Sequence, residues 1–513
     1  MSQEVRKIVL VSLNGNLLEL KIVGDPNPRE FQETIQSIKK VPGRQYQDYT
    51  WTIPKEQVDS LIKNVSNTTR IVWQTPISKI KNIEKEPVLP DFKVSNKYLD
   101  DFILTPYPFQ TIGISFLHDV EKCLIADEMG LGKTIQIMGA IWKLYKEGKV
   151  KKALVICPSS LKYQWREEIE KFLGDKAECT VIDGNAKKRK EVYGEINNMS
   201  CLFTIINYEL VRNDIEDLKE LHFDCIAADE IHRIKSWTSK TSLAIKELDA
   251  PYKFGSTGTP MQNKPEEIFN IFAFLNPDIL GNWWYFRKRY VVIGTKFKQK
   301  NVVLGYDNLD ELHDKLAKYM LRRLKTEVTP ELPEMIINNY LVPMTDKQIR
   351  AHEEIRENLV SLIKEVSEFN EYDENGNLVK EHPKAGQILG MFTMMQEICD
   401  SPELLQMSDS KMAQRYAIND TKSPKLDELV NIIKDILEND SAAKIVIFTQ
   451  FERMQRLIVD KISKLANCTV LNGKMNAVER QKSINNFTMG DAQIFISTDA
   501  GNYGWTKGLA RIS

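Results

Sequence analysis

The pattern of apolar and polar positions changes near Leu104. After this residue, short continuous apolar runs alternate with longer stretches whose apolar residues recur at helical spacing. The runs predict strands at Cys123–Ala126, Ala153–Cys157, Leu202–Ile206, Cys225–Ala228 and Lys253–Gly255, and a second series at Ile445–Phe448, Thr469–Leu471 and Ile494–Ile496. Because short buried strands separated by helices are typical of parallel sheets covered on both faces, we predict an α/β fold with two lobes.

The remaining pattern predicts further parts of the chain. Residues 1–76 read as a small α+β domain, with an alternating segment at Ile8–Leu20, helices at Phe31–Ile38 and Lys55–Val65, and an aromatic strand at Tyr49–Pro54. We expect a proline-containing linker at 77–103, lobe 1 at 104–280, a helical segment between the lobes at 281–340, and lobe 2 at 341–513. The polar stretch 368–383 predicts a surface hairpin or loop. The basic run Lys187–Lys190 predicts a solvated helix end, and the alternatives are a nuclear address or a phosphate-binding patch.

Composition narrows the class of protein. The chain has 513 residues, 42% of them apolar and 27% charged, which are values of globular proteins. No apolar run reaches the length of a transmembrane helix, and the seven cysteines contain no C-x-x-C pair, so we expect reduced thiols and no membrane association. We therefore expect a cytoplasmic protein of a bacterial or virus-infected cell, or a nuclear protein in a eukaryote. The net charge of −1 leaves the partner open, because only local charge binds a phosphate backbone.

The clearest chemical signal is Asp127–Thr134, which reads D-E-M-G-L-G-K-T. A strand, a glycine-rich turn and a helix direct backbone N–H groups toward phosphate oxygens, while Lys133 reaches the terminal phosphates and Thr134 holds Mg²⁺. Asp127 stands where the general phosphate-loop pattern has its first glycine. The alternative is a glycine-rich helix start that binds nothing. We predict a nucleotide site.

A pair of acidic residues follows another predicted strand. Asp229 stands at the end of the strand, where it can hold Mg²⁺ through water, and Glu230 can orient and deprotonate an attacking water molecule. Two adjacent acids are also common in turns, but Ile231 and His232 extend this pair to D-E-I-H. We interpret His232 as a coupling residue at the nucleotide pocket, because no cysteine or histidine lies at zinc-ligand spacing from it.

With these motifs and S-T-G-T-P-M-Q-N at Ser256–Asn263, the chain over about 104–504 resembles the Swi/Snf-type ATPases of helicase superfamily two, which are motors on double-stranded DNA. The other shared segments are Pro108–Gln110, Pro158–Leu161 with Trp165, Tyr208–Glu209, Leu321–Lys325, Leu332–Pro333, Ile447–Phe451, Gly473, Glu479–Arg480 and Ser497–Gly501. The resemblance implies two RecA-like lobes with parallel sheets, ATP and Mg²⁺ as cofactors, and double-stranded or branched DNA as the partner. It leaves protein partners open.

The resemblance also assigns roles to single residues. Gln110 would read the adenine edge, and Asp127, which is typical of the family, would form the nucleotide-binding loop with Gly130, Gly132, Lys133 and Thr134. Lys133, Asp229 and Glu230 would carry hydrolysis, with Thr134 and Asp229 on Mg²⁺. Ser256 and Thr257 would couple the nucleotide to DNA, and the segments that line the DNA backbone would include Pro158, Ser159, Asn207, Thr449, Ser497 and Thr498.

The N-terminal domain is similar to the small HARP-type domain of annealing helicases, through Phe31, the helix to Ile38, Pro42–Gly43, Tyr46, Trp51 and Pro54. This similarity implies recognition of branched DNA and an output such as fork remodelling. The alternative is that Tyr46, Tyr49 and Trp51 simply build a small apolar core.

The end of the chain departs from the family. The segment Trp505–Ser513 does not match the family's later element, whose arginines reach the γ-phosphate and contribute about 10³–10⁵ in rate. We therefore expect nucleotide binding with inefficient turnover, and an exposed sheet edge in a truncated lobe 2. The leading prediction is an ATP-dependent double-stranded-DNA translocase of annealing-helicase type. The alternatives are an ATP- and DNA-binding module with little turnover and, third, an RNA helicase.

Overall fold

The computed structural model describes residues 8–23, 28–47, 50–65, 70–73, 92–196, 201–261, 264–296, 299–328, 336–369, 371–372, 378–380 and 382–498. Its contacts divide the chain into a first unit, up to Leu332, and a second unit that covers most of the chain from Pro333. Each unit is described separately. Some residues of the predicted motifs lie outside the described residues, namely Tyr49, Gln262 and Asn263. Residues 499–513 also lie outside them, and the predicted loss of the C-terminal element depends on that segment.

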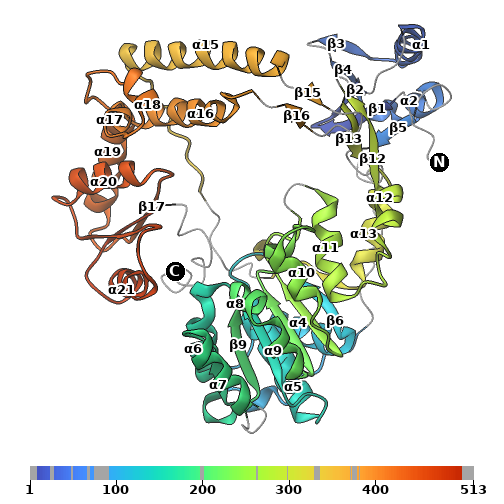
Figure 1. Cartoon of the computed structure of the whole chain (residues 1–513), viewed down its shortest axis with the longest axis vertical. Helices are drawn as coiled ribbons and strands as arrows, with labels where there is room; N and C mark the ends of the chain where they lie inside the picture. Colours follow the sequence, from blue (N-terminus) through green and yellow to red (C-terminus); the bar gives the residue numbers. More distant parts are fainter. Residues whose placement is uncertain are drawn as a thin grey trace. The chain divides into compact units, whose positions relative to one another are not determined.

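Lobe 1 is built on a seven-stranded sheet with the order β14-β6-β11-β10-β7-β9-β8, in which neighbouring strands pair in parallel (Figure 1). The strands are β6 (Lys122–Ile125), β7 (Ala153–Cys157), β8 (Cys179–Val181), β9 (Phe203–Asn207), β10 (Cys225–Asp229), β11 (Tyr252–Ser256) and β14 (Met320–Leu321). Five of these strands were predicted from apolar runs, so the α/β class of lobe 1 is confirmed. The short strands β8 and β14 were not predicted.

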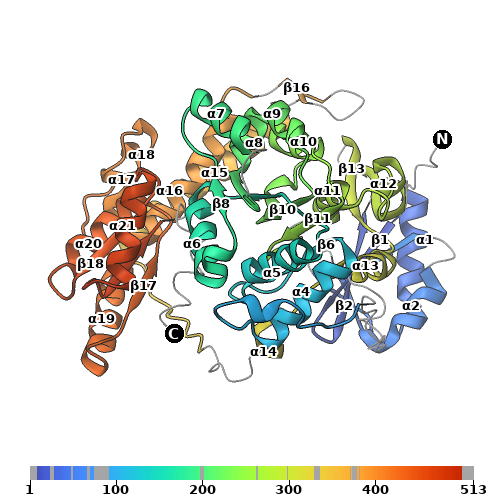
Figure 2. The same ribbon diagram turned by 90° about the horizontal axis from the view of Figure 1, so that it is seen from below.

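Both faces of this sheet are buried, as its continuous apolar strands require. Alternate residues of the strands, such as Ile125 and Val155, enter one apolar cluster with α4 (Pro108–Val120), α5 (Lys133–Lys146) and α6 (Lys162–Leu173). Their neighbours, such as Leu124 and Leu154, enter a second cluster on the opposite face. That face is covered by α7 (Ala186–Ile196), α8 (Tyr208–Asn213), α9 (Ile215–Glu220), α10 (Lys240–Lys246) and α11 (Pro265–Leu275), and both layers are visible in Figure 2.

The segment 281–340 differs from the predicted inter-lobe helical segment. It contains α12 (Trp283–Tyr290), α13 (Leu309–Ala317), α14 (Lys325–Val328) and an antiparallel hairpin of β12 (Val291–Lys296) and β13 (Gln299–Tyr306). Phe286, Tyr290 and Leu312 pack into the second cluster of lobe 1, and β14 pairs with β6. Most of this segment therefore belongs to lobe 1, because its apolar residues are buried there.

The N-terminal domain is the predicted α+β unit. Its sheet has the order β3-β4-β2-β1-β5, formed by β1 (Ile8–Asn14), β2 (Leu17–Val23), β3 (Gln45–Gln47), β4 (Thr50–Pro54) and β5 (Arg70–Trp73). The helices α1 (Pro28–Lys39) and α2 (Val58–Val65) complete a core that includes Leu20, Ile53 and Leu61. Trp51 packs against this core, but Tyr46 is 56% exposed, so the predicted aromatic core forms only in part.

The second unit contains a three-stranded parallel sheet with the order β17-β19-β18, from β17 (Ile445–Phe448), β18 (Cys468–Leu471) and β19 (Ile494–Ser497). Its helices are α15 (Asp346–Phe369), α16 (Ala385–Asp400), α17 (Glu403–Gln406), α18 (Lys411–Arg415), α19 (Pro424–Asn439), α20 (Glu452–Ile462) and α21 (Ala477–Thr488). The predicted surface hairpin is present as β15 (Glu371–Tyr372) and β16 (Leu378–Lys380). All three predicted strands of lobe 2 are therefore confirmed.

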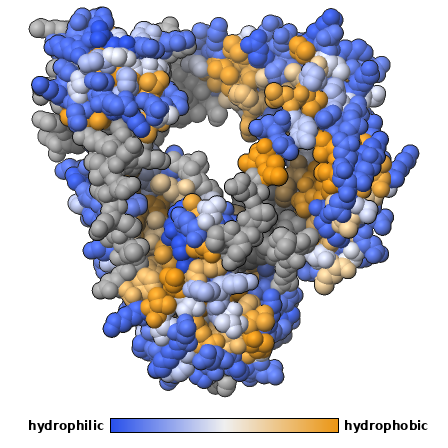
Figure 3. Space-filling view, turned by 180° about the vertical axis from the view of Figure 1, so that it is seen from behind, coloured by the Kyte–Doolittle hydropathy of each residue, from blue (hydrophilic) through white to orange (hydrophobic). Residues whose placement is uncertain are grey.

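Hydrophilic side chains dominate the face drawn in Figure 3, with apolar patches among them. Such a mixed surface is normal for a globular protein. Among the helices of the described residues, none combines the length and apolar character needed to cross a membrane.

Candidate nucleotide site

Strand register brings the two chemical motifs of lobe 1 to one edge of the sheet. Asp229 at the end of β10 pairs with Ser256 at the end of β11, and Ser256 pairs with Ile125 at the end of β6. The loop 126–132 follows Ile125 directly, so the predicted phosphate loop and the D-E-I-H motif lie side by side. Ligands of open α/β sheets bind at this carboxyl edge.

The phosphate loop has the backbone that its glycines permit. Gly130 and Gly132 have φ values of 90° and 69°, and α5 begins directly afterwards at Lys133. Lys133 Nζ donates to the carbonyl oxygens of Asp127 at 2.9 Å and of Glu128 at 3.3 Å, so the ammonium is held within the loop. Thr134 stands in the first turn of α5. The free backbone N–H groups of this turn make the helix N-terminus suited to bind phosphate oxygens.

Gln110 lies against the phosphate loop. Its Oε1 accepts from Tyr107 N at 2.9 Å, which caps α4, and its Nε2 is 3.5 Å from Leu131 O. A Cβ atom placed on Gly132 would lie 2.4 Å from Gln110 Nε2, so a larger residue at this position would displace the end of the Gln110 side chain. The predicted adenine-reading residue and the loop are thus in contact.

Asp127, the first residue of the predicted phosphate loop, has a buried environment. Its side chain is fully buried, and its two carboxylate oxygens accept hydrogen bonds from Arg323 and from Gln136 Nε2. The carboxylate is therefore turned into the protein, and Asp127 contributes to the phosphate side only through its backbone. The assignment of Asp127 to the nucleotide-binding loop stays a prediction.

Asp229 is held by hydrogen bonds on both of its oxygens. Trp165 Nε1 donates to Oδ2 at 2.9 Å, Ser256 Oγ donates to Oδ1 at 2.6 Å, and the side chain is buried. The Tyr208 hydroxyl donates to Asp229 O at 2.7 Å. Burial raises the pKa of the Tyr208 hydroxyl well above its usual value, so it remains a proton donor. The orientation of this carboxylate is fixed in advance.

Glu230 adopts an unusual backbone conformation. Its φ of 52° lies in the left-handed region, which is costly for a non-glycine residue and is concentrated at functional sites. Glu230 Oε2 lies 3.3 Å from His232 Nδ1, and the same nitrogen lies 3.1 Å from Thr257 Oγ1. His232 therefore connects the predicted catalytic base to the segment after β11, and its coupling role stays a prediction.

The residues predicted to couple nucleotide and DNA, or to line the DNA, differ in exposure. Ser256 and Thr257 are fully buried and present no hydroxyl at the surface. The Ser256 hydroxyl donates to Asp229, whereas the Thr257 hydroxyl lies against His232. Among the residues predicted to line DNA, Ser159 is exposed, Pro158 is buried, and Asn207 donates to Glu209 Oε2 at 2.7 Å.

In the second unit, three predicted residues meet at the edge of the small sheet. Thr449 N donates to Ser497 O at 3.0 Å, and Thr498 N donates to Leu471 O at 3.0 Å. The hydroxyl of Ser497 is buried and donates to Thr498 O at 2.9 Å. The two backbone bonds join the ends of neighbouring strands of the sheet, and Thr449 is the most accessible of the three residues.

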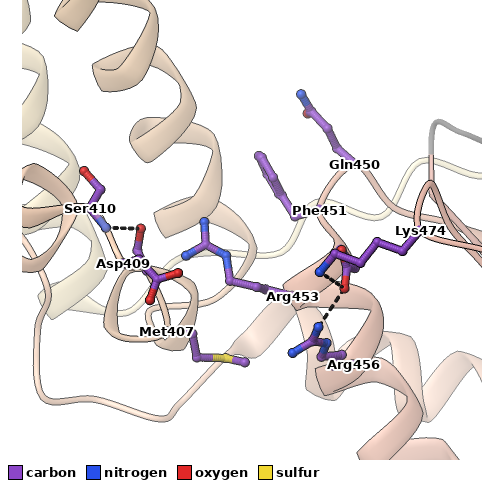
Figure 4. A pocket seen from close by; sticks show the side chains of 10 residues that line it. Met407, Asp409, Ser410, Gln450, Phe451, Arg453, Arg456 and Lys474 are labelled. Atoms are coloured by element: carbon purple, nitrogen blue, oxygen red, sulfur yellow. Dashed lines mark hydrogen bonds and ion pairs between the residues drawn. The ribbon is translucent and has the colours of Figure 1, made fainter.

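A hollow of about 540 Å³ lies beside this edge, between the loop that holds Met407 and Ser410 and the start of α20 (Figure 4). Arg456 and Lys474 both donate to Glu452 Oε1, at 2.7 and 2.9 Å. Arg453 donates to Leu404 O at 2.9 Å and pairs with Glu397. The three cationic side chains that line the hollow are thus paired with acceptors of the same unit, and we assign no ligand to the hollow.

The sequence missed several residues that orient the site. Trp165, Tyr208 and Arg323 appeared in shared segments, but no spacing in the sequence indicated that they contact Asp229 or Asp127. Only the parallel register of the sheet brings them there.

Two family models match the chain. A model of the SNF2-related domain matches residues 43–404, and a model of the helicase conserved C-terminal domain matches residues 425–509. Together they span the phosphate loop, the D-E-I-H motif and the sheet of the second unit.

Named relatives give a consistent picture. The helicase/translocase candidate YwqA of Bacillus subtilis is 28% identical over 83% of this chain and 44% of its own length. The DNA repair and recombination protein RAD54 of Saccharomyces cerevisiae is 26% identical over 74% of this chain and 45% of its own. The DNA annealing helicase and endonuclease ZRANB3 of Bos taurus is 35% identical over 45% of this chain and 22% of its own. The chain spans less than half the length of these relatives.

A solved structure also aligns with the chain. It is the Sulfolobus solfataricus SWI2/SNF2 ATPase core in complex with dsDNA, at 27% identity and a TM-score of 0.43, covering 79% of this chain and 80% of that one.

Proposed function

The chain belongs to the SNF2-related domain family, and on that premise we propose that it is an ATP-dependent translocase on double-stranded DNA. The observation that carries the proposal is the juxtaposition of the phosphate loop with Asp229 and Glu230 at the carboxyl edge of one parallel sheet. The names of the relatives add DNA as the polymer, since RAD54 acts in DNA repair and the aligned ATPase core was solved with dsDNA.

The side chains of lobe 1 fit this reaction in distinct roles. The α5 N-terminus and Lys133 would bind the phosphates, and Gln110 would contact the base. Glu230 would accept a proton from the attacking water molecule. His232 and Thr257 would carry the state of that site toward the polymer, because they join it to the segment after β11.

A divalent cation fits the oxygen donors at this edge. The Asp229 carboxylate and the Thr134 hydroxyl are hard oxygen ligands of the kind that Mg²⁺ prefers. Bound Mg²⁺ would neutralise phosphate charge. The protein's own contribution is to hold Asp229 in one orientation through Trp165 and Ser256.

The test compares ATP hydrolysis by the whole chain with and without duplex DNA. We expect duplex DNA to raise the rate, and the Lys133→Ala variant to give the background of the assay. Stimulation by RNA and not by duplex DNA would instead support an RNA helicase. ATP and DNA binding without stimulated hydrolysis would support a binding module and would refute the translocase.

We further propose that the N-terminal domain directs the motor to branched DNA. Support comes from the exposed ring of Tyr46, which lies 4.7 Å from the ring of Trp51 on the neighbouring strand and offers a surface for an unpaired base. The similarity to an annealing helicase is consistent with this role.

Removing the Tyr46 ring should therefore weaken binding to forks. We expect Tyr46→Ala to lower the affinity for a fork roughly 5- to 150-fold, since stacking on an aromatic ring contributes about 1–3 kcal/mol per base. Fluorescence anisotropy with fork and blunt duplex measures the change, and Tyr46→Phe, which keeps the ring, is the matched control. Equal losses for fork and blunt duplex, or no loss, would contradict the role.

A further inference from the structure

Arg323 occupies an unusual position in lobe 1. It follows β14, yet its guanidinium lies at the phosphate loop, 196 positions from Asp127 in the sequence. Its Nε donates to Asp127 Oδ1 at 3.0 Å, and one terminal nitrogen donates to Asp127 Oδ2 at 2.5 Å. The fork of the guanidinium thus grips both oxygens of one carboxylate.

The remaining donors of Arg323 reach two other segments. Its other terminal nitrogen donates to Phe109 O at 2.5 Å, next to Gln110. The nitrogen that contacts Asp127 Oδ2 also donates to Gln136 Oε1 at 2.8 Å, in the first turn of α5. The Arg323 guanidinium therefore links the segment Phe109–Gln110 by hydrogen bonds to both ends of the phosphate loop.

Burial makes this arrangement rigid. The Asp127 side chain is 0% exposed and that of Arg323 is 11% exposed. A buried charge that loses its partner is strongly unfavourable, so neither group has an alternative place in lobe 1. Backbone bonds reinforce the arrangement, because Ala126 N donates to Leu321 O and Glu128 N donates to Arg323 O.

We propose that Arg323 is a positioning residue that fixes the spacing between the segment Phe109–Gln110 and the phosphate loop. This spacing determines whether the base and the phosphates of one nucleotide can reach their binding segments at the same time. It thereby sets the preference for adenine. The inference rests on the proposed function, because it concerns the same nucleotide site. It also explains why an aspartate replaces the first glycine of the loop: Asp127 is the anchor for Arg323.

The test is Arg323→Lys, which keeps the charge but removes the planar fork. We expect the Kd and KM for ATP to rise about 10- to 100-fold, as for a misplacement of about 1 Å, with kcat at saturating ATP within about threefold of wild type. Preference for ATP over GTP should fall by about the same factor. Arg322→Lys, at the exposed neighbouring position, is the matched control and should change neither quantity.

A second variant separates positioning from general damage to the fold. Asp127→Asn removes the charge of the anchor and keeps its shape, so it should reproduce the loss of ATP preference. Because the two residues share an ion pair, the loss in the double variant should be smaller than the sum of the two single losses. Circular dichroism and thermal unfolding establish that each variant is folded, and Asp127→Asn carries the test alone if Arg323→Lys does not fold.

Binding of a fluorescent ATP analogue to the wild-type chain distinguishes a failure of the proposed function from a failure of the role proposed for Arg323. No binding by the wild type would refute the proposed function itself. Normal binding by the wild type, with an unchanged Kd and ATP/GTP ratio in the folded variants, would overturn only the role of Arg323. A lower kcat at unchanged KM, or additive losses in the double variant, would also overturn it.

Discussion

The Glu230→Gln variant is expected to bind ATP normally and to hydrolyse it about 10²- to 10⁴-fold more slowly than the wild type. This is the range that a positioned general base contributes, and an amide of the same shape cannot accept the proton. The backbone at Glu230 is held at φ 52°, so the new side chain should occupy the same place. Single-turnover hydrolysis with duplex DNA measures the loss, and titration with a fluorescent ATP analogue measures binding.

The matched control for this variant is Glu216→Gln. Glu216 also belongs to lobe 1, but 78% of its side chain is exposed and it lies on α9, away from the carboxyl edge. The Glu216→Gln variant should hydrolyse ATP at the wild-type rate. A Glu230→Gln rate within about tenfold of wild type would assign the proton transfer to another group. Loss of ATP binding by this variant would show that Glu230 supports the pocket and not the chemical step.

Much of the fold follows from the sequence because buried parallel strands leave a simple pattern. Ala153–Cys157 and Ile445–Phe448 were predicted with the bounds that the structure has, because both are continuous apolar runs. The first is buried at every position, as a strand covered on both faces is, whereas the second is a partly buried edge strand. The phosphate loop is equally local, because its glycines, Lys133 and Thr134 are adjacent in the chain. Short strands such as β14 escaped prediction, because two residues give no measurable pattern.

The contacts that orient the site are not local, and this is why the sequence did not show them. Trp165 reaches Asp229 across 64 positions, and Arg323 reaches Asp127 across 196. Each pair forms only after the order of the strands is set. Asp127 was visible as an odd first residue of the loop, but its partner was not. The position of the glycine-rich loop was thus predictable, whereas the contacts that support the loop were not.

The basic run Lys187–Lys190 illustrates the same limit. It predicted a solvated helix end, and Lys187, Lys188 and Lys190 are indeed exposed. Arg189 is buried instead and donates to both oxygens of Asp214, at 2.6 and 2.8 Å, while the Tyr193 hydroxyl donates to the same carboxylate at 2.8 Å. For this one residue the prediction was wrong, because charge alone does not reveal a buried partner on another element.

Arg189→Ala should therefore destabilise lobe 1 by about 3–5 kcal/mol, because it leaves the Asp214 carboxylate buried without its cation. Lys187→Ala, at an exposed position of the same helix, should change stability by less than about 0.5 kcal/mol. Thermal unfolding detects the loss, and hydrogen exchange of the amides in α7 and α9 locates it in lobe 1. Equal effects of the two substitutions would contradict the assignment.

The same pair predicts how the loss depends on pH. Burial raises the pKa of the Asp214 carboxyl, but hydrogen bonds from Arg189 and Tyr193 outweigh it and leave this pKa below its usual range. A carboxyl with a lowered pKa in the folded state stabilises the protein above its unfolded pKa, and this contribution disappears as the pH falls through the folded pKa. The difference between wild type and Arg189→Ala should hence be full at pH 7 and shrink below about pH 4. A difference that stays the same from pH 7 to about pH 3 would mean that the pair stabilises lobe 1 by packing alone.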